Sequence, residues 1–304
     1  MICEFNNASV SIEGQEVLKQ IQWSIPKGSV VGLLGKNGAG KSTLIRSLLG
    51  LIRTSDGSIT TLGVEAIKID DKEKAMLAYV PQTSVGYEGI SVKRALQVHS
   101  ACYPNWNQAL ANRMIEKFSI AEKQKVQKLS VGQRQLLMLI FALASKPSFL
   151  VMDEPVASLD PSARRDILQF ITEACDEGCT ILYSTHITGD IHRLADRVAL
   201  LANGKIEFDH SCEMLDNTVS IRNFQDVSSI LKKLSLLGFE NKLLHHNENE
   251  VLVCDWNEDI EINFDETVVL QKLNLEELFI RWHKIQDQLN QLGFNANSSE
   301  RIAS

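Results

Sequence analysis

The sequence predicts an α/β fold in which a buried parallel sheet carries a phosphate-binding loop, followed by a small C-terminal α/β extension. The main observation is the order of elements around the glycine-rich residues 35–43, which lie between an almost entirely apolar run at 29–34 and a helical segment at 42–51. Other short apolar runs have the length and composition of parallel strands buried on both faces. These runs lie at 78–80, 149–152 and 180–184.

Helical and hairpin signals complete the first two thirds of the chain. Helical spacing dominates between Gln82 and Ser145, which predicts a helical insertion at about 83–145. The first thirty residues predict short strands around a turn at Glu13-Gly14. Asn203-Gly204, between apolar runs at 198–202 and 205–208, predicts a two-residue hairpin.

Beyond about Asp209 the pattern changes and predicts a small accessory α/β region. Asn274 and Glu277 suit a capping pair at the start of the last helix, and a polar tail follows from about Asn295. We expect strands at 219–224, 251–256 and 266–270, and helices at 227–237 and 275–289. The expected domains are therefore residues 1–210 and residues 211–304.

Composition limits the class of partner. The net charge of −7 over 304 residues argues against nucleic acid, because nucleic-acid-binding proteins normally present a basic face. The longest apolar candidate, at 136–144, is about half as long as the roughly 20 residues that cross a bilayer. Residues 1–5 lack the basic segment and apolar core of a signal peptide. We therefore expect a protein that is made and kept in the cytosol.

The glycine-rich loop, GKNGAGKST, is of the G-x-x-x-x-G-K-[ST] type. Its glycines allow backbone N–H groups to converge on phosphate oxygens, and the following helix adds its positive N-terminal dipole. We expect Lys41 to reach the β- and γ-phosphates and the Ser42 hydroxyl to ligate Mg²⁺. The loop alone leaves kinases, GTPases, helicases and recombinases open. The nucleotide contacts expected from it are Gly35, Asn37, Gly38, Ala39, Gly40, Lys41, Ser42 and Thr43.

Two carboxylates, Asp153 and Glu154, follow the apolar run at 149–152, as in a Walker B motif. We expect Asp153 to assist the Mg²⁺ shell, mostly through water, and Glu154 to polarise the attacking water as a general base. An acidic pair after a strand is more often a helix cap. The phosphate-binding loop upstream reverses that preference.

The pentapeptide at 129–133, LSVGQ, separates the phosphate-binding classes. Ser130 stands where an N-cap is expected, just before a helix at 133–145, and such a helix start offers free N–H groups and a hydroxyl to an anion. Lys41 already serves the phosphates within the same chain. A second anion site on a separate segment makes sense if it meets ATP bound to another subunit.

The order of these motifs resembles the nucleotide-binding domain of the ATP-binding cassette (ABC) family over residues 1 to about 210. The resemblance implies a mixed-sheet core, an antiparallel β subdomain and a helical subdomain, with ATP and Mg²⁺ as cofactors. Gln82 matches the Q-loop glutamine that senses Mg²⁺ and water, and His186 matches the switch histidine that contacts the γ-phosphate, so both join Glu154 as catalytic residues. The resemblance also implies Mg²⁺ contacts from Ser42, Gln82 and Asp153. The residues that match the signature and the D-loop, and so contact nucleotide across a dimer, are Ser130, Gly132, Gln133 and Asp160.

Two positions depart from the family pattern. Val131 replaces the usual first glycine of the signature, and we expect slower or altered hydrolysis at most. Ile12 stands where the family usually stacks an aromatic ring on adenine. An aliphatic side chain gives up the aromatic contribution, about 1 kcal/mol, so adenine selectivity is expected to be weak.

The principal hypothesis is an ATP-hydrolysing subunit of an ABC transporter that works as a homodimer or pseudo-dimer. Because the chain has no hydrophobic span, efflux would require a separate integral-membrane permease, with this subunit on the cytoplasmic face. The runs at 103–106, 163–165 and 273–279 resemble bacterial exporter-type cassettes. The aromatic residues within 83–106 fit either contact with that permease or packing inside the insertion. The alternatives are a soluble ABC ATPase in cluster assembly or regulation, and a nucleotide-binding scaffold without turnover.

Overall fold

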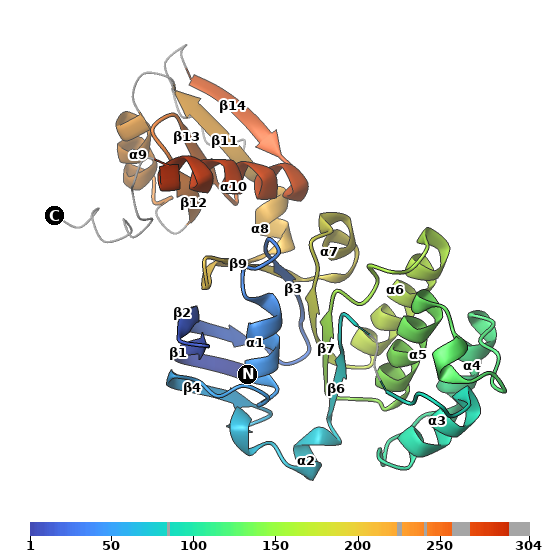
Figure 1. The fold of residues 1–304 in the computed structure, drawn as a ribbon. Coiled ribbons are helices and arrows are strands. Elements are labelled where there is room, and N and C mark those ends of the chain that lie inside the picture. Colours follow the sequence, from blue (N-terminus) through green and yellow to red (C-terminus); the bar gives the residue numbers. More distant parts are fainter. Residues whose placement is uncertain (84–85, 224–226, 240–241, 257–267, 292–304) are drawn as a thin grey trace. The chain divides into compact units, whose positions relative to one another are not determined.

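The computed structural model describes residues 1–83, 86–223, 227–239, 242–256 and 268–291, with side chains described as far as residue 287 (Figure 1). The chain divides into two compact units, Met1–Asp209 and His210–Ser304. Each unit has a hydrophobic core of its own. None of the described helices combines the length and apolarity needed to cross a bilayer.

A four-stranded antiparallel sheet begins the first unit, in the order β2-β1-β4-β5. Its strands are β1 (Cys3–Ile12), β2 (Gln15–Ile25), β4 (Asp56–Thr61) and β5 (Val64–Glu65). The predicted turn at Glu13-Gly14 is confirmed, and both of its residues have a positive φ. The chain segments of β4 and β5 were not predicted as strands, because β4 is mostly polar and buries only alternate side chains at its end.

A six-stranded sheet forms the centre of the first unit, in the order β10-β9-β3-β8-β7-β6. The neighbours from β9 to β6 pair in parallel, as the apolar runs predicted. The predicted hairpin joins β9 to β10 through Asn203 and Gly204, with φ of 51° and 78°. The strands are β3 (Val30–Leu34), β6 (Leu77–Val80), β7 (Phe149–Asp153), β8 (Thr180–Ser184), β9 (Arg197–Ala202) and β10 (Lys205–Ser211). The expected mixed-sheet α/β core is confirmed.

Alternate residues of the central strands enter two different cores, which explains why every residue of β3, β7 and β8 is buried. One face packs against α1 (Lys41–Leu48) and the antiparallel sheet. The other face packs against α5 (Val131–Ala144) and α6 (Pro161–Asp176). Because the strands are parallel, the loops after β3, β6, β7 and β8 emerge at one edge of the sheet (Figure 1).

The helical insertion predicted at 83–145 is confirmed in its described residues. It contains α3 (Val92–Ser100), α4 (Gln108–Lys117), a short 3₁₀ helix (Val126–Lys128) and α5. Outside the insertion lie a 3₁₀ turn (Ala66–Lys68), α2 (Asp71–Lys74) and α7 (Thr188–Leu194). Ser130 is the N-cap of α5, as expected, and nearly all of α5 after its first turn is buried.

The second unit contains a four-stranded antiparallel sheet in the order β12-β13-β11-β14. The predicted capping pair is confirmed, since Asn274 and Glu277 exchange hydrogen bonds of 3.1 and 2.9 Å. The elements are α8 (Cys212–Asp216), β11 (Thr218–Asn223), α9 (Val227–Leu236), β12 (Leu243–His246), β13 (Glu250–Val253), β14 (Val268–Leu273) and α10 (Leu275–Gln291). The sequence did not predict α8 or β12. The expected strand ends at Phe224 and Glu266 and the tail from about Asn295 lie outside the described residues.

Candidate active site

The glycine-rich loop joins β3 to α1 in a backbone conformation that its glycines make possible. Gly38 and Gly40 have φ of 83° and 105°, in the left-handed region that favours glycine. A Cβ at Gly35 would lie 2.5 Å from the carbonyl oxygen of Leu201, so no larger residue fits there without a shift. These conformations leave backbone N–H groups of the loop available beside the N-terminus of α1, and together they make an anion-binding arrangement. Of the remaining predicted contacts, Asn37 and Ala39 lie in the turn of this loop and Thr43 lies in the first turn of α1.

Lys41 is the first residue of α1 and is 6% exposed. Its Nζ donates to the carbonyl oxygen of Gly35 at 2.7 Å and lies 3.7 Å from Oε1 of Glu154. Burial lowers the pKa of Lys41, and the nearby carboxylates of Glu154 and Asp153 oppose that shift. The ammonium group is therefore placed between the phosphate-binding loop and the predicted general base.

Ser42 and Asp153 lie together, as their predicted role at Mg²⁺ requires. The Ser42 hydroxyl donates to Oδ2 of Asp153 at 2.7 Å, and the Ser184 hydroxyl donates to Oδ1 at 2.6 Å. Asp153 and Ser184 are both buried at the ends of neighbouring parallel strands, where they are register partners. A hydroxyl and a carboxylate oxygen are hard donors of the kind that Mg²⁺ accepts, so the residues present fit this ion.

Glu154 is the point at which the strand ends converge. Its Oε2 lies 3.1 Å from Nδ1 of His186, which follows β8, and 3.5 Å from Nε2 of Gln82, which follows β6. The Glu154 side chain is 8% exposed, whereas His186 is 49% exposed. The segments after β3, β6 and β8 thus bring Lys41, Gln82 and His186 to the carboxylate of Glu154, which itself follows β7.

The backbone of Glu154 is unusual, with a φ of 48° in the left-handed region. Such a conformation is uncommon for a residue with a side chain and costs of order 1–2 kcal/mol. Its N–H donates to the carbonyl oxygen of Ser184 at 3.1 Å and lies 3.2 Å from the Ser184 hydroxyl, so β8 holds this conformation in place. The turn aims the Glu154 carboxylate toward Lys41 and His186.

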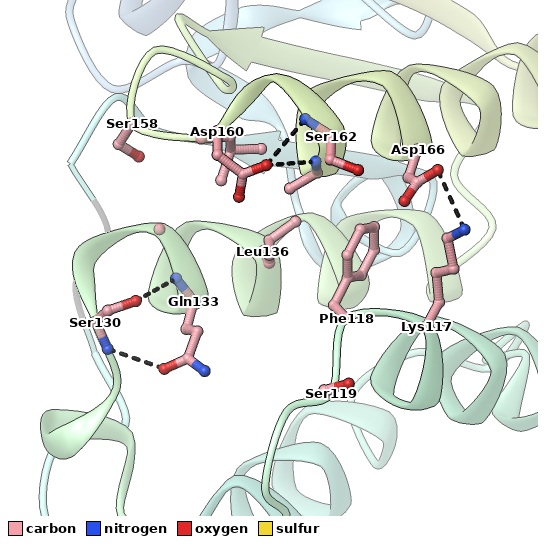
Figure 2. A pocket seen from close by; sticks show the side chains of 13 residues that line it. Lys117, Phe118, Ser119, Ser130, Gln133, Leu136, Ser158, Asp160, Ser162 and Asp166 are labelled. Carbon is pink, nitrogen blue, oxygen red and sulfur yellow. Dashed lines mark hydrogen bonds and ion pairs between the residues drawn. The ribbon is translucent and has the colours of Figure 1, made fainter.

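The signature and D-loop residues line a separate cavity of about 500 Å³ (Figure 2). Ser130 and Gln133 form a capping box, with hydrogen bonds of 3.1 Å in both directions between the two residues. Asp160 caps α6 by accepting from the backbone N–H groups of Ser162 and Ala163, and these hydrogen bonds lower the pKa of Asp160. Gly132 approaches the Ser158 backbone so closely that an added Cβ would lie 3.2 Å from its carbonyl oxygen. Neither Lys41 nor Glu154 lines this cavity.

Sequence reasoning missed two groups that support these sites. Ser184 binds both Asp153 and the Glu154 backbone, and its only sequence signal was its place just before Thr185-His186 at a strand end. Asp190 on α7 is buried and forms an ion pair with Arg164 of α6. The Tyr183 hydroxyl donates to the same carboxylate at 3.2 Å. This second group ties the D-loop helix to the helix that follows His186.

The described structure also locates the two departures and the aromatic residues of the insertion. Val131 is 61% exposed and Ile12 is 39% exposed, so neither side chain is committed to a core. Tyr87, Tyr103 and Trp106 are half-buried and gather around His99. Packing inside the insertion therefore accounts for much of their surface.

A glycine-rich loop between a parallel strand and a helix, with a hydroxyl–carboxylate pair and a buried glutamate beside it, defines a P-loop nucleotide hydrolase. Comparison with known proteins narrows this class. Residues 18–157 match the family model described as ABC transporter. The chain is 32% identical over 204 residues to the ABC transporter ATP-binding protein YtrB of Bacillus subtilis, covering 67% of this chain and 70% of that protein. This chain therefore belongs to the ABC transporter ATP-binding proteins, and it is an ATP-hydrolysing subunit of that kind.

Two further relatives extend the comparison. The uncharacterized ABC transporter ATP-binding protein YcbN of Bacillus subtilis is 26% identical over 307 residues and covers 98% of each chain. The linearmycin resistance ATP-binding protein LnrL of the same organism is 31% identical over 195 residues, which are 62% of this chain and 63% of that protein. These relatives support the transporter subunit over the soluble alternative.

A solved structure confirms the fold class. A structure described as the ATP binding subunit of an ABC transporter superposes with a TM-score of 0.64 and 28% identity. The superposed region covers 69% of this chain and 90% of the chain in that structure.

Proposed function

We propose that this chain powers efflux through a separate integral-membrane permease, by ATP-driven closure of a dimer of cassettes on the cytoplasmic face of the membrane. The observation that carries the proposal is the division of the expected nucleotide contacts into two sets. Lys41 and Glu154 belong to one set, and Ser130 and Asp160 line a separate cavity with their own helix starts. Two ATP molecules would each lie between the first set of one chain and the second set of the other.

The loop and α1 would hold the phosphates in the first set. Backbone N–H groups of residues 35–43 and the N-terminus of α1 would bind phosphate oxygens, and Lys41 would exchange its carbonyl contacts for the β- and γ-phosphates. Ser42 and Asp153, with Gln82, would hold Mg²⁺, with Ser184 fixing the Asp153 carboxylate. Mg²⁺ would supply positive charge at the phosphate oxygens when it is bound.

Hydrolysis would take place at Glu154. Its carboxylate would accept a proton from the water that attacks the γ-phosphorus, and the bond to the bridging oxygen would break to release ADP and phosphate. His186, 3.1 Å from the same carboxylate, would donate to the γ-phosphate. Gln82 would orient the water, since its amide already reaches Glu154.

Two kinds of likeness support export as the direction of transport. One relative is named for linearmycin resistance, a role that export of a toxic compound would serve. The runs at 103–106, 163–165 and 273–279 also resemble exporter-type cassettes. No nucleic-acid partner is proposed, because the net charge is −7.

The closing experiment compares Glu154→Gln with wild type by size-exclusion chromatography in ATP and Mg²⁺. Glutamine keeps the shape of the side chain but cannot accept the proton, so the variant should accumulate an ATP-bound dimer and lose at least about 100-fold in turnover. Glu177→Gln serves as a matched control, because Glu177 forms a surface ion pair with Lys146. A Glu154→Gln protein that stays monomeric with ATP would overturn the proposal.

The permease partner is tested by purification from detergent-solubilised membranes of cells that express the tagged chain. A membrane protein recovered in stoichiometric amount is expected. Consistent absence of such a protein would contradict the transport part of the proposal and leave the ATPase untouched.

A further inference from the structure

The segment that follows β6 and carries Gln82 is attached to helix α5 through its own first residue, Pro81. Gln135, in the second turn of α5, is 2% exposed, and its Nε2 donates to the carbonyl oxygen of Pro81 at 3.1 Å. Pro81 directly precedes Gln82 and directly follows β6. Because the Gln135 side chain is buried, loss of this hydrogen bond costs more free energy than it would at the protein surface.

A second attachment lies five residues further along the segment. The Tyr87 hydroxyl lies 2.8 Å from Nδ1 of His99 on α3, and the Tyr87 ring meets the Phe141 ring of α5 at 5.1 Å. His99 itself stacks on Phe141 at 4.4 Å. Burial lowers the pKa of His99 to about 4, so the ring is neutral at physiological pH and suits a hydrogen bond with a neutral hydroxyl.

Tyr87 makes this contact from an unfavourable backbone conformation. Its φ is 60°, in the left-handed region that a large side chain seldom adopts. Such conformations persist where surrounding contacts hold them. Its side chain contacts His99 and Phe141, which indicates that α3 and α5 specify the position of Tyr87.

The same helix carries the signature residues at its N-terminus. Ser130 caps α5, and Gln135 lies about one and a half turns further along. At the other end of the link, Gln82 reaches Glu154 at 3.5 Å. A continuous path of covalent and hydrogen bonds thus runs from Ser130 through α5, Gln135 and Pro81 to Gln82.

We infer that Gln135 is a positioning residue that makes the Gln82 segment move together with α5, with the Tyr87–His99 pair as its second attachment. This inference rests on the proposed function and adds regulation to it. When the partner's ATP binds at Ser130 and Gly132, the displacement of α5 is passed to Gln82 and sets its place against Glu154. Binding of ATP at one nucleotide site therefore changes the position of Gln82 at the other site of the dimer.

The test measures ATP hydrolysis as a function of ATP concentration in Gln135→Met. Methionine has similar length and volume but donates no hydrogen bond. We expect kcat to fall about tenfold and positive cooperativity to disappear, while ATP binding to the monomer stays as in wild type. Leu139→Met is the matched control, because it changes a fully buried position of the same helix that has no hydrogen bond to lose.

A second variant covers the case in which Gln135→Met is poorly folded. Tyr87→Phe removes only a hydroxyl from a half-buried ring, and we expect a smaller loss of kcat, about threefold, with reduced cooperativity. Tyr103→Phe is its control, because it removes a hydroxyl from the same aromatic group but not from the Gln82 segment. The two losses should be non-additive in the double variant, since both act on one segment.

The outcomes separate the inference from the proposed function. If wild type is cooperative and Gln135→Met and Tyr87→Phe change only thermal stability, as their controls do, the inference is overturned and the proposed function stands. If the Glu154→Gln variant forms no dimer with ATP and wild type hydrolyses ATP without cooperativity, the proposed function fails and the inference fails with it.

Discussion

Around Glu154, polar groups such as Lys41 and Asp153 are buried and bonded to other side chains or loop carbonyls, whereas Ser130 and Asp160 are solvent-exposed and bonded to the backbone of their own helix starts. The first set joins loops after four parallel strands, so its geometry is fixed by the sheet. The second set is built from two helix caps beside an open cavity of about 500 Å³. The difference indicates two half-sites of different character. The half-site around Glu154 is preorganised, whereas the half-site around Ser130 is open to a ligand held by another molecule.

Removing the cation of the buried set should have the largest effect. Lys41→Ala deletes the group between the loop and Glu154, and hydrolysis should fall by at least about 100-fold because a charge-stabilising donor is lost. Lys36→Ala, in the exposed part of the same loop, should retain most of the activity. Steady-state ATPase and equilibrium ATP binding measure both variants. Comparable losses in the two variants would show that the loop, and not the Lys41 ammonium, carries the effect.

Weakening the strand-end network tests whether the sheet fixes the buried half-site. Ser184→Ala removes the 2.6 Å hydrogen bond to Asp153, and we expect a loss of about 1–2 kcal/mol in unfolding free energy. We also expect half-maximal ATPase activity to require an about tenfold higher Mg²⁺ concentration. Ser47→Ala is a matched control, because its buried hydroxyl donates to the Leu44 carbonyl away from Asp153. It should lose stability alone, as chemical denaturation and Mg²⁺ titration would show.

Removing a cap tests the exposed half-site. Ser130→Ala should cost about 1 kcal/mol of stability by loss of the N-cap, and should lower kcat while leaving ATP binding to the monomer unchanged. Ser91→Ala removes the N-cap of α3 in the same way. Equal kcat in the two capping variants would contradict a role for Ser130 at the partner's nucleotide.

The smallest expected effect concerns Asp160. Hydrogen bonds from Ala163 and Ser162 lower its pKa below the ordinary value of 3.8, so its stabilising contribution is fully present above pH 3.8 and is lost as pH falls through the lowered pKa. Asp160→Asn should therefore have a slightly lower Tm than wild type at pH 7, and the two curves should approach each other below pH 4. A constant Tm difference from pH 7 to pH 3 would contradict this origin.

The sequence allowed the parallel strands to be predicted, because burial on both faces leaves continuous apolar runs such as 149–152. The polar strand β4 carries no such run, and it pairs with β1, which lies far away in the sequence. The short strand β12 carries no such run either, and its side chains are only half-buried although its partner β13 follows directly. Motif order likewise indicated Lys41 and Glu154. The place of Ser184 could not be predicted, because its contact with Asp153 exists only through the register of β7 against β8.

The left-handed backbone of Glu154 has a consequence for how this chain can change over evolution. A glycine at position 154 would relieve the strain of that turn, and would also delete the carboxylate that we propose takes a proton from water. At this residue, selection for a more stable fold and selection for turnover point in opposite directions. The protein therefore keeps its chemistry by remaining below the stability that its own backbone could reach.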